Sequence, residues 1–131
     1  MEIISAKKFY ATLTIGLRMG YTTENIPLKA VYDELSRLQD QLIKEKQLYL
    51  SANCYESTIV LSGHREPHLN IRFINYPRFP IEEHLFKAEV QALAIQLMKS
   101  FHQNRLLIEF DQELIMVQQN KELDAGIVVG C

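Results

Sequence analysis

Cysteine is scarce, tryptophan is missing, and long apolar runs are absent from this sequence of 131 residues. Two cysteines, Cys54 and Cys131, are too few and too badly placed for a disulfide framework, which favours a reducing compartment. No apolar run approaches the roughly 20 residues that a membrane span needs, and the first residues lack the basic and apolar stretches of a signal peptide. We therefore expect a cytoplasmic protein that has no membrane partner.

Positive and negative charges are nearly balanced in the sequence. The formal net charge of −2 and the isoelectric point near 6.1 give no field that would attract nucleic acid, so no nucleic-acid partner is expected. The sequence has no Gly-rich phosphate loop, nucleophile elbow or cysteine-pair zinc motif, and it therefore indicates no cofactor. What is present, 47% hydrophobic and 23% charged residues, is typical of a globular chain with one core.

Hydrophobic periodicity predicts the secondary structure. Helices are expected where apolar residues recur every three or four positions, over residues 27–46 and 81–102. Strands are expected where apolar and polar residues alternate or β-branched residues gather, over residues 9–18, 48–61, 69–73 and 105–110. A polar turn over residues 62–67 joins the second and third strands, and a short additional strand is expected over residues 114–117.

The order strand, helix, strand, strand, helix, strand is that of the ferredoxin-like βαββαβ sandwich, an α+β fold. We expect a four-stranded, antiparallel-type sheet with both helices on one face. Residues 1–118 would form a single domain, and residues 119–131 a flexible C-terminal tail. From right-handed crossovers we also infer that the first and third strands are parallel neighbours at the centre of the sheet.

At the level of the fold, over about residues 9–117, the chain resembles the small oligomeric ferredoxin-like proteins of the PII and CutA groups. Residues 16–21 and 75–80 also resemble segments of short uncharacterised bacterial proteins. No nucleotide loop or metal-ligand signature of the PII and CutA groups can be matched residue by residue. The resemblance therefore implies a fold and a homo-oligomer, and no site is carried over from it.

Two basic loops are the first candidate for a ligand site. Arg18 and Tyr21 follow the first strand, whereas Asn75, Tyr76 and Arg78 follow the third. If these strands run parallel, their ends meet at one edge, where both helices begin. Guanidinium groups, phenols and the free N–H groups of helix N-termini would there bind a phosphate or a carboxylate.

The two arginines also have a structural interpretation. Glu24, Glu82 and Glu83 lie near Arg18 and Arg78 in the sequence, and surface arginines commonly pair with local carboxylates. Ion pairs would then hold the two loops in place, and no ligand would be needed.

Histidine and cysteine give a weaker signal. His64, His68 and Cys54 are residue types that zinc accepts. Pro67 argues against a helix between the two histidines, so the helical two-histidine motif of metalloproteases is not formed. We interpret this segment as a solvated hairpin tip and predict no metal site.

Three classes of function remain open. We favour a non-enzymatic ligand-binding or regulatory protein. It would bind a small anion between the loops of Arg18 and Arg78 and self-associate through its exposed sheet face. An alternative is a small enzyme that uses His64, His68 or Tyr76 in acid–base chemistry, although the histidine turn is expected at the opposite end of the sheet from the arginines. The third class is a protein-interaction accessory domain without a small-molecule site.

Overall fold

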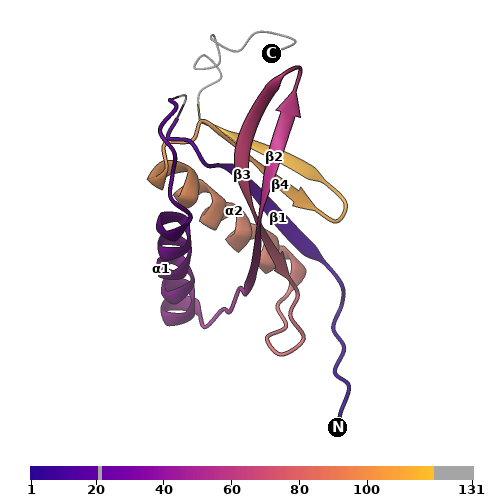
Figure 1. The fold of residues 1–131 in the computed structure, drawn as a ribbon. Helices are drawn as coiled ribbons and strands as arrows, with labels where there is room; N and C mark the ends of the chain where they lie inside the picture. The colour runs from indigo at the N-terminus through magenta and orange to yellow at the C-terminus, as the bar shows by residue number, and fades with distance from the viewer. Residues whose placement is uncertain (21, 120–131) are drawn as a thin grey trace.

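The computed structural model describes residues 1–20 and 22–119. Its elements are β1 (Tyr10–Gly16), α1 (Leu28–Lys46), β2 (Ala52–Leu61), β3 (His64–Ile74), α2 (Glu83–Ser100), β4 (Arg105–Phe110) and β5 (Leu114–Gln118). The five strands form one sheet in the order β2-β3-β1-β4-β5, and every neighbouring pair is antiparallel. Both helices lie on one side of this sheet (Figure 1).

The predicted βαββαβ fold is confirmed, including the short additional strand, which is β5. The expected tail over residues 119–131 lies, apart from Gln119, outside the described residues. Within the described part of the chain, neither helix combines the length and the apolar character that a membrane crossing requires.

The core lies between the helices and one face of the sheet. Alternate residues of β1 point into it, so that Leu13 and Ile15 are fully buried. The second helix contributes Phe86, whose ring meets that of Phe9 edge-on with 5.0 Å between the centroids. Removal of this apolar surface from water, at about 25 cal/mol per Å², is the main stabilising contribution to the fold.

The connection between β2 and β3 is shorter than predicted. Only Ser62 and Gly63 form the turn, with φ angles of 47° and 90°. Two-residue hairpin turns with positive φ at both positions match the twist of the flanking strands, and for this reason they favour glycine. The hairpin ladder therefore continues to Leu61 and His64, and Pro67 lies inside β3 opposite Thr58.

The first and third strands are neighbours, as predicted, but the prediction that they run parallel is wrong. β1 pairs with β3 in antiparallel register, with Tyr10 opposite Ile74 and Gly16 opposite His68. A right-handed crossover makes β1 parallel to β2, and the tight hairpin then reverses the chain, so that β3 inserts between them antiparallel to both. As a result, the end of β1 lies beside the start of β3.

Glu34 connects the two helices. Its carboxylate accepts hydrogen bonds from Arg37 on the same helix, at 2.6 Å and 3.0 Å, and from the Ser100 hydroxyl at the end of α2, at 2.5 Å. The hydrogen bonds from Arg37 lower the pKa of Glu34 below its ordinary value of 4.5, helped by the bond from Ser100 and opposed by partial burial.

We expect Glu34→Gln to lower the free energy of unfolding by about 1 kcal/mol or less at neutral pH, because the charge-assisted bonds are lost. Because the pKa of Glu34 is lower in the folded than in the unfolded protein, its carboxylate stabilises the fold at pH values above 4.5. This stabilisation is lost as the pH falls through the lower pKa of the folded state. Urea titrations across this pH range should therefore show the two proteins converging in acid. Glu56→Gln, at an exposed position of β2, is the control. A deficit that stays constant with pH would contradict the assignment.

Candidate functional site

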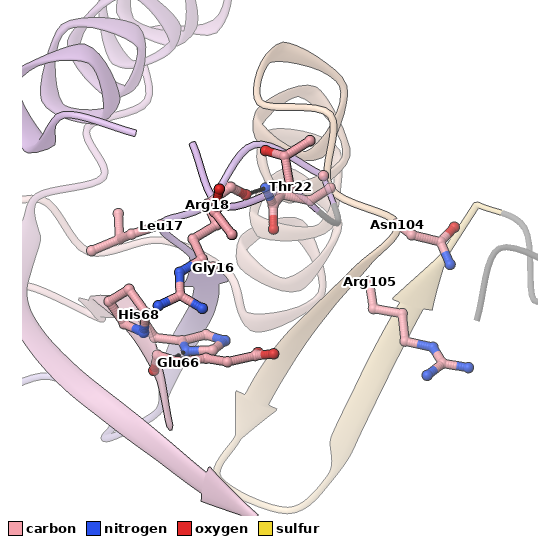
Figure 2. Close-up of a pocket in the computed structure, with 12 residues that line it drawn as sticks. Gly16, Leu17, Arg18, Thr22, Glu66, His68, Asn104 and Arg105 are labelled. Carbon is pink, nitrogen blue, oxygen red and sulfur yellow. Dashed lines mark hydrogen bonds between the residues drawn. The ribbon is translucent and has the colours of Figure 1, made fainter. Parts of the chain in front are cut away.

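A hollow of about 410 Å³ opens where β1 ends and where β3 and β4 begin. Antiparallel pairing makes these three points meet, since Gly16 lies opposite His68 and Thr14 lies opposite Leu107. The loop that follows β1 closes the remaining side. The residues that line the hollow come from three segments, namely 16–18 with 20 and 22–23, then 66–68, and finally 103–105 (Figure 2).

The loop after β1 is held back on itself by backbone hydrogen bonds. Met19 N–H donates to Glu24 O at 2.8 Å, and Ile26 N–H donates to Leu17 O at 2.7 Å. Gly20 takes a φ of +56°, in the left-handed region that favours glycine. The loop therefore forms a defined wall of the hollow.

Charged side chains of both signs border the hollow. Figure 2 shows Arg18, Glu66 and His68 gathered on one side, with Arg105 across from them. The Arg18 guanidinium makes no ion pair with any residue in the described part of the chain. Arg105 donates from Nε to Gln118 Oε1 at 2.8 Å. The arrangement suits a ligand that carries both a carboxylate and an amino group.

Two further side chains of the hollow, His68 and Gln103, contact backbone carbonyl oxygens. His68 Nδ1 lies 3.0 Å from the carbonyl oxygen of Glu66. A carbonyl only accepts, so Nδ1 carries the proton, and in the neutral ring Nε2 is left as an acceptor. Gln103, which is 7% exposed, donates from Nε2 to Arg18 O at 2.7 Å and to Phe101 O at 2.9 Å. The amide of Gln103 therefore ties the start of β4 to the loop after β1.

The residues predicted to form one site are not brought together. Arg18 lines the hollow, whereas Asn75, Tyr76 and Arg78 follow the end of β3, at the opposite end of β1 beside Tyr10. Tyr21 lies outside the described residues. The cause is the antiparallel direction of β3, which sends the two basic loops to opposite ends of the sheet. A ligand-binding role for Arg18 stays a prediction.

Asn75 connects three segments of the chain by hydrogen bonds, a role that the sequence around it does not indicate. Its side-chain amide donates to Lys7 O at 2.8 Å, and its oxygen accepts from Ile81 N–H at 3.0 Å. Its own N–H donates to Phe9 O at 3.1 Å. The residue is 8% exposed, and it joins the segment before β1, the end of β3 and the approach to α2.

The ion pairs considered for the two arginines are not formed. Arg78 lies over the Phe79 ring at 5.2 Å from the centroid. Glu82 instead accepts from Leu85 N–H at 2.9 Å and caps α2, and Glu83 pairs with Lys7 at 2.8 Å. The loop before α2 is thus held by aromatic contacts and a helix cap.

The histidines separate, although the sequence places them in one turn. His64 begins β3 at the exposed hairpin tip, while His68 lies further along the strand and lines the hollow with Arg18. The expectation that the histidine segment lies far from both arginines is therefore wrong for His68. Burial raises the pKa of the Cys54 thiol, which disfavours the reactive thiolate. No cluster of three or more metal-binding side chains occurs among the residues that the structure describes.

Gly16 and Gln103 were not predicted as site residues. A Cβ at Gly16 would lie 2.8 Å from Gln103 Oε1, so only glycine lets the Gln103 amide lie this close to β1. A glycine inside an alternating strand often marks such a close approach, and this was the available signal. No comparable signal marks Gln103, because its role depends on a backbone carbonyl 85 residues away in the sequence.

No protein-family model and no curated protein matches the chain. Two solved structures match it, and both are of phage SAM lyase, where SAM stands for S-adenosylmethionine. The lyase in complex with S-methyl-5'-thioadenosine is 18% identical, with a TM-score of 0.69 over 91% of this chain and 95% of that chain. The lyase in the apo state is 17% identical, with a TM-score of 0.68 over 92% and 96%.

These comparisons correct two expectations. The resemblance to the PII and CutA groups is wrong, because the matching structures are phage SAM lyases. The interpretation as a non-enzymatic regulatory protein that binds a small anion is contradicted by the same finding, which supports the enzyme alternative better. At this level of identity, the likeness to the phage SAM lyases shows that the chain shares their fold.

Proposed function

We propose that this protein is an enzyme that binds S-adenosylmethionine and cleaves it to S-methyl-5'-thioadenosine, in the cytoplasm that its cysteine-poor sequence favours. The observation that carries the proposal is the structural likeness to phage SAM lyase, which extends over more than 90% of both chains. The hollow at the end of β1 supports it, since its volume of about 410 Å³ falls in the usual range for small-molecule sites.

The chemistry of the hollow matches the chemistry of the substrate. S-adenosylmethionine carries a carboxylate, an ammonium group, a sulfonium and an adenine. Arg18 supplies a guanidinium for the carboxylate, and Glu66 supplies a carboxylate for the ammonium. Gln103 Oε1 and, in the neutral form of the ring, His68 Nε2 are acceptors that are left for the uncharged end of the substrate.

Release of S-methyl-5'-thioadenosine requires cleavage of the bond between the sulfonium and Cγ of the methionine part. The electron pair of this bond moves to sulfur, which becomes a neutral thioether. The four-carbon fragment is completed in one of two balanced ways. Its own carboxylate attacks Cγ and closes a lactone, or a base removes a proton from Cβ and leaves an alkene. Both routes discharge the sulfonium, so a site that excludes water favours either of them.

The direct test is incubation of the purified protein with S-adenosylmethionine and measurement of S-methyl-5'-thioadenosine by mass spectrometry, against a protein-free blank. We expect release above the blank, and we expect Arg18→Ala to reduce kcat/KM by about tenfold or more, since a charged hydrogen-bond partner is lost. Arg65→Ala, on the exposed part of β3, is the matched control. Release no faster than the blank would overturn the proposal.

We also propose that copies of the chain associate through the sheet face that the helices leave uncovered. This face and the loop beside it carry Ile74 and Tyr76, which are 40% and 42% exposed, next to polar side chains such as Arg72. A mixed surface of this kind is typical of symmetric assemblies. Light scattering on the purified protein measures its mass, and a monomer at micromolar concentration would contradict this proposal.

A further inference from the structure

The side-chain oxygen of Gln103 is buried without a hydrogen-bond donor from the described residues. Both N–H bonds of its amide are used, toward Arg18 O at 2.7 Å and Phe101 O at 2.9 Å. Rotation of the amide by half a turn would place Oε1 against these two carbonyl oxygens, so its orientation is fixed. A buried acceptor that is left unpaired destabilises the protein, and a donor on a ligand or a water would remove this cost.

This oxygen lies beside Gly16, and both residues line the hollow. The position that a Cβ of residue 16 would occupy lies 2.8 Å from Gln103 Oε1 and 3.8 Å from His68 Nε2. Because His68 Nδ1 donates to Glu66 O, Nε2 is an acceptor in the neutral ring. Gln103 Oε1 and, in the neutral form of the ring, His68 Nε2 are therefore two acceptors beside Gly16 on the wall of the hollow, and the absence of a side chain at Gly16 lets them lie there.

We infer that this part of the hollow, the recess beside Gly16, binds the exocyclic amino group of adenine, with Gln103 Oε1 and His68 Nε2 each accepting one of its two N–H bonds. The assignment rests on the proposed function, and it names the part of the substrate that this corner of the hollow selects. An ammonium group would be drawn instead to the Glu66 carboxylate at the border of the hollow. A flat aromatic ring that carries a neutral amino group can approach the backbone of Gly16 closely, because no Cβ intervenes.

Calorimetry with two product-like ligands tests the inference. S-methyl-5'-thioadenosine carries the amino group, whereas S-methyl-5'-thioinosine presents an oxygen acceptor at the same position. The wild-type protein should bind the adenosine form at least about tenfold more tightly, since the inosine form sets an acceptor against an acceptor. Equal affinity for the two ligands would overturn the inference and leave the proposed function intact. Failure of both ligands to bind, with no cleavage of S-adenosylmethionine, would overturn both.

Gln103→Met removes the acceptor with little change of volume. We expect this variant to bind the adenosine form about tenfold more weakly and to lose its preference over the inosine form. Gln96→Met, at an exposed position of α2, controls for the substitution itself. A preference that persists in Gln103→Met would overturn the assignment to this residue. Gln103→Met could instead weaken the binding of S-adenosylmethionine and leave the binding of S-methyl-5'-thioadenosine unchanged. The recess would then hold the ammonium group, and the assignment to the adenine amino group would be overturned. The comparison of the two ligands on the wild-type protein needs no variant, so it decides the question if Gln103→Met does not fold.

Discussion

Alanine at position 16 is expected to abolish detectable binding of S-methyl-5'-thioadenosine and to lower the free energy of unfolding by about 1–3 kcal/mol. The added Cβ would stand 2.8 Å from Gln103 Oε1, a separation that real Cβ atoms essentially never show. Gln103 cannot move aside freely, because its amide is hydrogen-bonded to Arg18 O and Phe101 O. The methyl group would also occupy the recess that we assign to the adenine amino group. Titration calorimetry and urea unfolding measure the two effects.

A double variant separates the clash from the loss of the recess. Gly16→Ala combined with Gln103→Ala removes the atom that the new Cβ would meet, so the two stability losses should be less than additive. Binding should not return, because the acceptor is gone. If Gly16→Ala alone were as stable and as competent in binding as the wild type, the floor of the hollow would not be rigid and the clash argument would fail.

Asn75→Ala is expected to lower the free energy of unfolding by about 2–4 kcal/mol, because Lys7 O and Ile81 N–H would both lose a hydrogen-bond partner at a site where little water enters. The side chain is 8% exposed and bridges two segments that no strand pairing connects. Thermal and urea unfolding monitored by circular dichroism give the change. The variant should retain cleavage of S-adenosylmethionine while folded, since Asn75 lies at the opposite end of β1 from the hollow.

Asn75→Asp keeps an acceptor for Ile81 N–H but places a carboxylate oxygen against Lys7 O. At neutral pH this variant should lose at least as much stability as Asn75→Ala, because a buried charge then faces a carbonyl oxygen. Asn53→Ala, at an exposed position of β2, should change stability by no more than about 0.5 kcal/mol. Equal losses of stability in Asn53→Ala and Asn75→Ala would show that the hydrogen bonds of the Asn75 side chain do not stabilise the fold.

The elements could be predicted from the sequence because each depends on local periodicity. Leu13 and Ile15 alternate with polar residues and are buried on the core face of β1, as expected. The predicted helices differ from α1 and α2 by no more than two residues at either end. The order of these elements was also sufficient to indicate the ferredoxin-like arrangement.

The direction of one strand was predicted wrongly, and the expected meeting of the two arginine loops was wrong for the same reason. Whether β3 runs parallel or antiparallel to β1 does not change the alternation of Leu69, Ile71 and Phe73, so the pattern carries no information on it. The hairpin did carry that information, since a tight turn reverses the chain before β3 inserts beside β1. With the correct direction, His68 and Arg18 would have been expected at the same end of the sheet.

The sequence by itself determined the helices, the strands and the fold class, because these follow from side chains only a few positions apart. Only the tertiary structure decided the hollow, since Gly16, His68 and Gln103 come from three separate segments. The orientation of the Gln103 amide is the clearest case. Carbonyl oxygens of Arg18 and Phe101 impose it, and backbone carbonyls are the same in every residue, so no sequence pattern announces them.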